Sequence, residues 1–115
     1  MARRWLNSAD VEISDNGEQV VAHRSAAAAN TTKVDVTSAG QTALAANLNR
    51  ICAVLVNDSD TDIYIKLGTG PAVGIGIKLN AYGGSFAITA ANLYTGQVTA
   101  ICASATAKGL LVTEF

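Results

Sequence analysis

The 115-residue sequence predicts an all-β domain, an antiparallel sandwich or barrel that follows an extended N-terminal arm. Seven short runs of alternating or β-branched residues occur from residue 33 onward, and Gly, Asn, Asp or the lone Pro71 bounds them. No helical pattern of about 10 to 15 residues alternates with these runs, which disfavours a parallel α/β sheet. The length suits one domain with a modest core.

The expected strands span residues 33–37, 50–57, 62–68, 74–80, 84–90, 96–104 and 109–115. Their length and spacing are typical of sandwiches and barrels. One further stretch is ambiguous. Residues 41–50, QTALAANLNR, could make one helical turn, but their Asn residues and the neighbouring turn signals favour a loop.

The sequence divides into an arm, residues 1–33, and a β-sandwich body, residues 34–115. Residues 1–35 hold nine of the 17 charged side chains, which indicates a solvated or extended segment. Within it, VEISDNGEQVV (residues 11–21) places Asn-Gly between apolar residues, and this pair suits the type I′ turn of a hairpin. The four alanines at 26–29 are too few for a stable helix, so we interpret them as a connector.

Three aspartates at alternate positions, Asp58, Asp60 and Asp62, resemble the first half of a calcium loop. A loop of the EF-hand type also needs Gly at its sixth position and Glu at its twelfth. Those positions hold Ile63 and Thr69. We therefore predict a polar turn between two strands, with an irregular cation site as the alternative.

Composition disfavours several classes of protein. A net charge of −1 provides no electrostatic attraction to nucleic acid. The apolar runs are far shorter than the roughly 18 residues of a membrane span. The two N-terminal arginines precede no apolar signal region, so we expect synthesis in a cytoplasm. Cys52 and Cys102 are then expected to be buried free thiols and not a disulfide.

The residues that catalysis needs are sparse. His23 is the one histidine, and it lies in the arm. The glycine-rich stretch at 68–76 lacks the third glycine of a dinucleotide site and the Lys-Ser/Thr of a P-loop, so we expect turns and a close-packed strand there. No G-x-S-x-G motif and no histidine–cysteine zinc set occurs. We predict a non-enzymatic protein without cofactor or metal.

A structural or binding role remains. Residues 63–113 carry three charged side chains, Lys66, Lys78 and Lys108, so their surface is easily buried against another protein. Trp5 is a candidate anchor of the arm, and a cap over the protein's own core is its alternative role. The candidate partner-binding residues are the apolar residues of the arm: Trp5, Leu6, Val11, Ile13, Val20 and Val21.

Residues 50–115 carry a series of motifs: RICAVLVNDSDTDIYIKLG, GIGIKLNAYGGSF, ANLYTGQVTAIC and LLVTEF. This series resembles small β-rich structural proteins of tailed bacteriophage virions, of the capsid decoration (cement) or head-fibre type. It covers a little over half of the chain, and the first 33 residues carry no part of it.

The resemblance implies a jelly-roll-like subunit that is made in the host cytoplasm and binds the outside of a capsid. The implied partners are the major capsid protein and further copies of the chain, with a trimer as the expected oligomer. The implied function is to stabilise contacts between adjacent capsomers. The alternative is a head- or tail-fibre domain that binds a host glycan through loops 68–73 and 90–95, with Tyr82 or Tyr94 stacked on the sugar.

Overall fold

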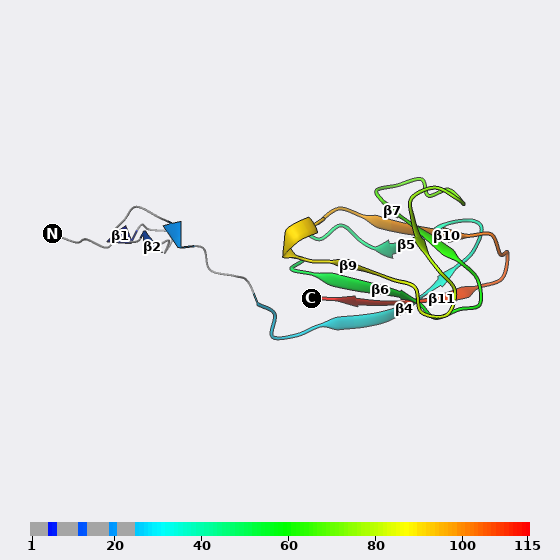
Figure 1. Cartoon of the computed structure of the whole chain (residues 1–115), viewed down its shortest axis with the longest axis horizontal. Coiled ribbons are helices and arrows are strands. Elements are labelled where there is room, and N and C mark those ends of the chain that lie inside the picture. Colours follow the sequence, from blue (N-terminus) through cyan, green and yellow to red (C-terminus); the bar gives the residue numbers. More distant parts are fainter. Residues whose placement is uncertain (1–4, 7–11, 14–18, 21–24) are drawn as a thin grey trace.

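Two antiparallel four-stranded sheets lie face to face as two layers (Figure 1). The computed structural model describes residues 5–6, 12–13, 19–20 and 25–115, with side chains from residue 25 onward. The strands of the two layers are β4 (Asn30–Val36), β5 (Gln41–Leu44), β6 (Ala53–Asn57), β7 (Ile63–Leu67), β8 (Ile77–Leu79), β9 (Ser85–Ile88), β10 (Val98–Cys102) and β11 (Lys108–Glu114). A 3₁₀ turn, η1 (Ala90–Asn92), separates β9 from β10. The predicted all-β antiparallel sandwich is confirmed.

The strands pair in a nested order. β4 pairs with β11, β5 with β10, β6 with β9 and β7 with β8, and the resulting sheets run β4-β11-β6-β9 and β5-β10-β7-β8. The four pairs are nested along the chain, because each pair joins strands that lie between the strands of the previous pair. Asn30 of β4 lies opposite Glu114 of β11, so the chain enters and leaves the sandwich at the same end, which we call the entry end.

The core lies between the layers, and every strand of the sandwich contributes to it. Alternate residues of a strand point to opposite faces, and β6 shows the pattern clearly: Ala53 and Leu55 are buried while Val54 is exposed. Each fully buried Val, Leu or Ile side chain stabilises the fold by about 1.5–3 kcal/mol. The core residues are Val36, Ala43, Leu44, Ala53, Leu55, Ile63, Ile65, Leu79, Ile88, Val98, Ala100, Cys102, Leu110 and Val112.

The prediction of a loop for residues 41–50 is wrong for the first four residues, because Gln41–Leu44 form strand β5. This strand pairs with β10, where Thr99 lies opposite Thr42 and Val98 lies opposite Leu44. The register shift between those pairs is a bulge, which breaks the alternation, and Ala43 and Leu44 are consequently both buried. Pairing with the buried strand β10 outweighs the weak β-propensity of Gln and Ala.

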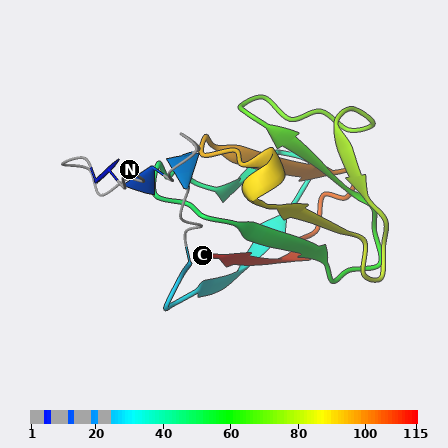
Figure 2. The ribbon, with the colours of Figure 1, turned by 60° about the vertical axis from the view of Figure 1, so that its left-hand side comes forward.

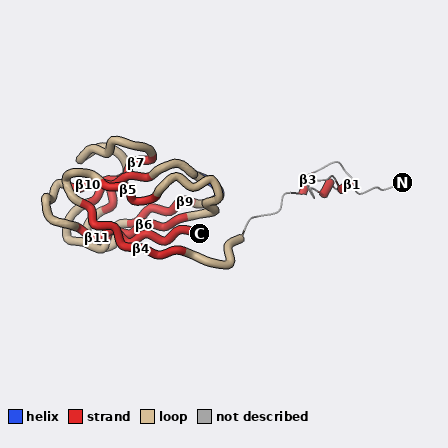
Figure 3. The backbone as a smooth tube through the Cα atoms, turned by 180° about the vertical axis from the view of Figure 1, so that it is seen from behind, coloured by secondary structure: helices blue, strands red, loops and turns tan. Residues whose placement is uncertain are grey.

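Three two-residue strands, β1 (Trp5–Leu6), β2 (Glu12–Ile13) and β3 (Gln19–Val20), form a small antiparallel sheet. β2 pairs with β3 as the expected hairpin requires, while its turn, residues 14–18, lies outside the described residues. The alanine connector is exposed and has no regular structure (Figure 3). β4 already begins at Asn30, four residues before the predicted start of the body.

Candidate functional site

The polar turn between β6 and β7 is confirmed, and the side chain of Asn57 organises it. Asn57 is completely buried, and its Nδ2 donates to the carbonyl oxygens of Thr61, at 2.8 Å, and Leu79, at 2.9 Å. Its Oδ1 accepts a hydrogen bond of 2.6 Å from the Ser59 hydroxyl. Buried amides that lack partners are costly, so this satisfied network fixes the shape of the turn.

The carboxylates of this turn bind separate partners. Asp60 accepts from Lys108 Nζ at 2.8 Å, and this hydrogen bond is the main cause that lowers the pKa of Asp60. Asp62 accepts from the Ala81 backbone N–H at 2.9 Å, which is the main cause that lowers its pKa. Among the described residues, no group of three or more His, Cys, Asp or Glu side chains is placed to hold a metal ion.

A second turn, residues 80–84, lies against the polar turn. Its backbone N–H groups donate to the polar turn at two points: Tyr82 to the Ser59 carbonyl and Gly83 to the Asn57 carbonyl, each at 2.8 Å. At its apex Tyr82 has a φ of 62°, a left-handed conformation that is unusual for a bulky residue. The Tyr82 side chain is 83% exposed. We call the pair of turns, residues 57–62 and 80–84, the tip; it lies at the end of the sandwich opposite the entry end.

The outer face of the β4-β11-β6-β9 sheet is open and nearly uncharged. Register places Val54 between Thr113 and Ala87 in one row, and Val56 between Leu111 and Ser85 in the next. None of these six residues is charged. Val54 and Leu111 are exposed large hydrophobic residues. We call this surface the open sheet face; Lys33 of β4, opposite Leu111, is the charged residue in these two rows.

The glycine-rich loop, residues 68–76, crosses part of the outer face of the β5-β10-β7-β8 sheet (Figures 1 and 2), whereas Thr42, Lys66 and Lys78 of this sheet are exposed. Thr99 and Ile101 point outward from β10 and yet are only 5% and 8% exposed. The Thr99 hydroxyl donates to the Gly68 carbonyl at 2.8 Å. Pro71 lies close to Gly40, because a Cβ added at Gly40 would come 3.1 Å from Pro71 Cγ. The predicted turns are confirmed, and the two sheets therefore differ in what their outer faces offer to a partner.

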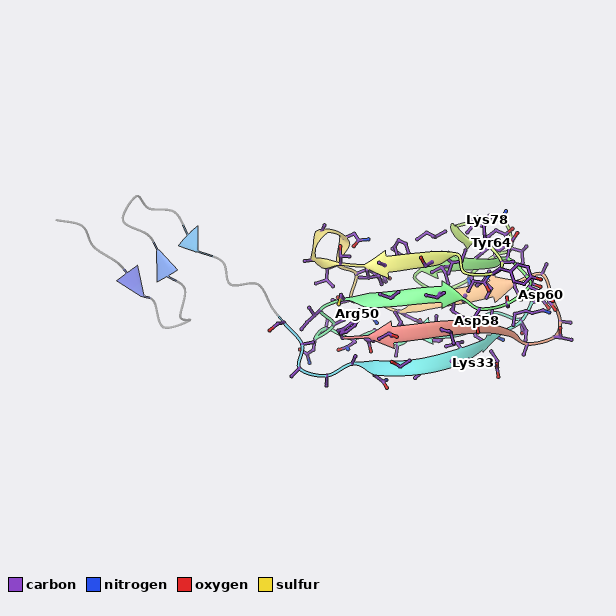
Figure 4. All side chains as sticks on the ribbon, turned by 60° about the horizontal axis from the view of Figure 1, so that its bottom comes forward. Lys33, Arg50, Asp58, Asp60, Tyr64 and Lys78 are labelled. Carbon is purple, nitrogen blue, oxygen red and sulfur yellow. The ribbon has the colours of Figure 1, made fainter. Side chains whose placement is uncertain are left out.

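Arg50 holds the entry end together. It is fully buried, and its guanidinium donates to Glu114 Oε2 at 2.6 Å and to the Ala45 carbonyl at 2.6 Å. It also donates to the carbonyls of Tyr94, at 2.7 Å, and Gly96, at 3.1 Å. One side chain thus joins residues 45–50 to residues 94–96 and to Glu114. Figure 4 shows Arg50 at the entry end.

The sequence analysis missed Arg50 as a structural residue. The sequence does distinguish this residue, because Arg50 is the one arginine in residues 25–115 and lies in a segment poor in charge. The contact between the turn of residues 80–84 and the polar turn was also missed, because pairing between distant strands brings the two turns together.

The two cysteines differ from each other. Cys102 is buried in the core, as predicted, and its Sγ lies 3.4 Å from the Val36 carbonyl oxygen. Cys52 is only partly buried, so its predicted burial is wrong in degree. Both thiols are free. Cys52 lies outside β6, just before the first buried position, which explains its partial exposure.

The predicted partner-binding residues lie outside the sandwich. The backbone of Trp5, Leu6, Ile13 and Val20 belongs to β1, β2 and β3, whereas Val11 and Val21 lie outside the described residues. Side chains are described only from residue 25 onward, so the contacts of all six stay a prediction.

Two further findings complete the description of the candidate surfaces. In the part of the chain that the structure describes, no helix is long and apolar enough to cross a membrane. Comparison with protein-family models, with curated proteins and with solved structures finds no match to this chain.

Proposed function

We propose that the protein is a structural component of a tailed-phage virion, a decoration protein that binds the outer surface of the capsid and has no catalytic role. The open sheet face is the observation that carries this proposal. The sequence motifs of residues 50–115 support the choice of a virion, and the surface supports a docking role.

The open sheet face is suited to burial against another protein. Its two rows contribute Val54, Val56 and Leu111, and none of these side chains loses charge solvation on docking. Four neighbouring strands about 4.8 Å apart form a nearly continuous platform. Three large apolar side chains are few for a standard interface, which buries roughly 800 Å² per partner. We therefore infer that further contacts complete the attachment.

The arm is the natural source of these further contacts. Its apolar residues, among them Trp5 and Ile13, precede a connector that joins the sandwich at the entry end. A second attachment point on the same shell raises the effective concentration of the first. Copies bound side by side on adjacent capsomers then stabilise the shell collectively, and we propose a homo-oligomer for the same reason.

The docking prediction is tested with a double variant, Val54→Lys plus Leu111→Lys, in a co-sedimentation assay. The shells are purified capsids of the phage that encodes the chain, prepared without this protein. Each lysine would have to be desolvated on docking, so we expect the affinity for shells to fall about tenfold or more per charge. Circular dichroism and a urea unfolding curve check that the variant is folded.

A matched control places one lysine on the other sheet. Thr42 is exposed on β5, so Thr42→Lys adds a charge outside the open sheet face. We expect unchanged binding to shells for this control. Equal binding by the double variant and the native protein would contradict docking through this face.

The fibre alternative stays a prediction, and of the two tyrosines that it names, Tyr82 is exposed and Tyr94 is partly buried. In the loop of residues 68–73, Gly68 accepts a hydrogen bond from Thr99, and the loop has no aromatic residue. Tyr94 packs against the core and over Gly96, where an added Cβ would come 2.6 Å from the Tyr94 hydroxyl. Neither loop presents a free aromatic ring to a sugar.

A further inference from the structure

Strand β4 lies at the edge of the β4-β11-β6-β9 sheet, and among the described strands it pairs only with β11 (Figure 1). Figure 4 shows Lys33 on this strand, at the margin of the sheet. We propose that this edge binds a second copy of the chain. The two β4 strands pair antiparallel across a two-fold axis at Val34 and join the two sheets into one. This inference concerns the isolated chain and does not rest on the virion function proposed above.

The first step is that β4 differs from the other edge strands of the sandwich. It is seven residues long, and its register with β11 is regular throughout. β5 and β9 have four residues, β8 has three, and a bulge interrupts the pairing of β5. On β9, the Ala87 carbonyl accepts a hydrogen bond of 3.1 Å from Asn92 Nδ2. Short, bulged or covered edges discourage pairing with another chain, so β4 is the edge of the described sheets that remains open to it.

The second step is to identify which backbone groups of β4 point outward. The Gly109 carbonyl of β11 accepts from the Asp58 N–H, on the β6 side, at 3.0 Å. Backbone groups alternate between the two sides of a strand, so the next residue of β11, Leu110, bonds to the β4 side. Leu110 lies opposite Val34. Val34 therefore bonds to β11, and the residues on either side of Val34 direct their N–H and C=O groups to the free edge.

The third step is that the charges of β4 select one register. Lys33 and Asp35 flank Val34, and both are exposed. Neither side chain has an ion-pair partner in residues 25–115. An antiparallel pair centred on Val34 places Lys33 of one copy opposite Asp35 of the other, and the two-fold axis repeats this contact. A pair centred on Lys33 or on Asp35 would instead place like charges opposite each other, which is destabilising.

The same register satisfies the backbone groups at the free edge. Lys33 and Asp35 both face this edge, so each Lys33–Asp35 pair exchanges the two N–H···O bonds of an antiparallel ladder. The ladder ends at Thr37, whose N–H already donates to Gln41 Oε1 at 2.7 Å. The contact is small, so we expect a reversible dimer that salt weakens, because its ion pairs are exposed.

The dimer doubles the open sheet face. Residues directly opposite each other in an antiparallel pair have their side chains on the same side of the sheet, so the outer faces of the two copies become continuous. Two four-stranded sheets joined at β4 form one sheet. A partner of this face then meets Val54, Val56 and Leu111 from both copies on one surface.

The test is the oligomeric state of the purified full chain, measured by sedimentation equilibrium over a range of protein concentrations. We expect a monomer–dimer equilibrium. Lys33→Asp should raise the dissociation constant about tenfold, because carboxylates then lie opposite each other in both pairs. Asp35→Lys should do the same with opposed ammonium groups. Lys33→Asp plus Asp35→Lys exchanges the two charges and should restore the native dissociation constant.

Hydrogen exchange followed by NMR locates the contact on the chain. The Lys33 and Asp35 N–H groups should exchange more slowly as the protein concentration rises. The Val34 N–H bonds to β11 and should be protected at every concentration. As a control, Lys66→Asp makes the same charge change at an exposed position of β7, and it should leave the dissociation constant unchanged. Urea unfolding curves check that each variant is folded.

Four results would overturn the proposal. Two are a chain that stays monomeric at every concentration and a chain that forms a trimer. The third is a double charge exchange that does not restore the dimer, since the register at Val34 requires it to do so. The fourth is protection of the Lys33 and Asp35 N–H groups that does not change with concentration, which would show that the chain's own arm covers this edge. All four are measured on the isolated chain, whereas failure to bind shells concerns only the proposed virion function.

Discussion

Arg50 shows how one residue can close a sandwich. Its guanidinium is buried with the Glu114 carboxylate at one side and three backbone carbonyls at the others. A planar fork with five donors can satisfy this set of acceptors, and a lysine ammonium cannot reach them in the same geometry. The entry end is therefore held by a polar network and not by apolar packing alone.

Replacing this arginine should be among the most destabilising substitutions in the sandwich. Arg50→Met leaves the buried acceptors without donors, and removal of one partner of a buried pair costs about 3–5 kcal/mol. A small domain has a total stability of only about 5–15 kcal/mol. The midpoint of urea unfolding should fall markedly, and the same measurement on Glu114→Gln should show a smaller loss because the arginine keeps its carbonyl partners.

The lysine substitution separates charge from geometry. Arg50→Lys keeps the positive charge near Glu114 but cannot span Ala45, Tyr94 and Gly96 together. We expect its unfolding midpoint to lie between those of Arg50→Met and the native protein. A native midpoint in Arg50→Lys would show that charge alone holds this end.

Among the elements, the strands of the sheets are predicted far better than the connections between them. β6, β7 and β11 carry alternating or β-branched runs, and the sequence therefore places all three within a few residues. β5 has no such signal, because its burial arises from a bulge and from pairing with β10. Local composition cannot reveal a partner that is more than 50 residues away in the chain.

The candidate sites, like the strands, are predicted where they depend on local sequence and missed where they depend on pairing between distant strands. The sequence identifies the acidic turn and its lack of a complete calcium motif, since both depend on local spacing. It does not reveal that Tyr82 lies beside this turn, or that the glycine-rich loop folds over one sheet and leaves the other open. These features depend on the nested pairing of strands, which no single segment encodes.

The acidic turn should make stability depend on pH. The Ala81 N–H and then Lys78 hold the pKa of Asp62 below its ordinary value of 3.8. A carboxylate whose pKa is lower in the folded state than in the unfolded state stabilises the fold at pH values above its unfolded-state pKa. This stabilisation is lost as the pH falls through the folded-state pKa. We therefore expect the native protein to lose stability relative to Asp62→Asn as the pH falls below about 3.8.

Urea unfolding midpoints between neutral pH and about pH 2 measure this difference. Lys78→Met is the matched control, because it removes the ion pair and keeps the hydrogen bond from Ala81. Most of the pH dependence should persist in that variant. Parallel curves for the native protein and Asp62→Asn would show that the carboxylate charge contributes nothing to the turn.

At the scale of the whole molecule, three separate regions have different roles. The entry end joins the sandwich to the arm, the open sheet face offers a nearly uncharged platform, and the tip presents Tyr82 at the opposite end. A subunit that docks through the arm and the sheet face leaves the tip exposed.

The proposed virion role predicts a mechanical effect on particles. Shells filled with DNA and lacking the protein should assemble, but they should release DNA at lower temperature and after milder osmotic shock than decorated shells. Many modest contacts act together on one shell, so resistance should rise steeply with the fraction of sites occupied. The release is followed with a DNA-binding dye during heating, while native protein is titrated onto undecorated particles.

The docking double variant and Tyr82→Gly, a substitution in the tip, distinguish the sources of this effect. Val54→Lys plus Leu111→Lys should leave particles as fragile as undecorated shells at matched protein concentration, because it cannot dock. Tyr82→Gly should restore full resistance, because the tip takes no part in attachment. If native protein bound the shells fully and left the release temperature unchanged, the protein would bind the capsid without stabilising it. The proposed role in stabilising capsomer contacts would then be wrong.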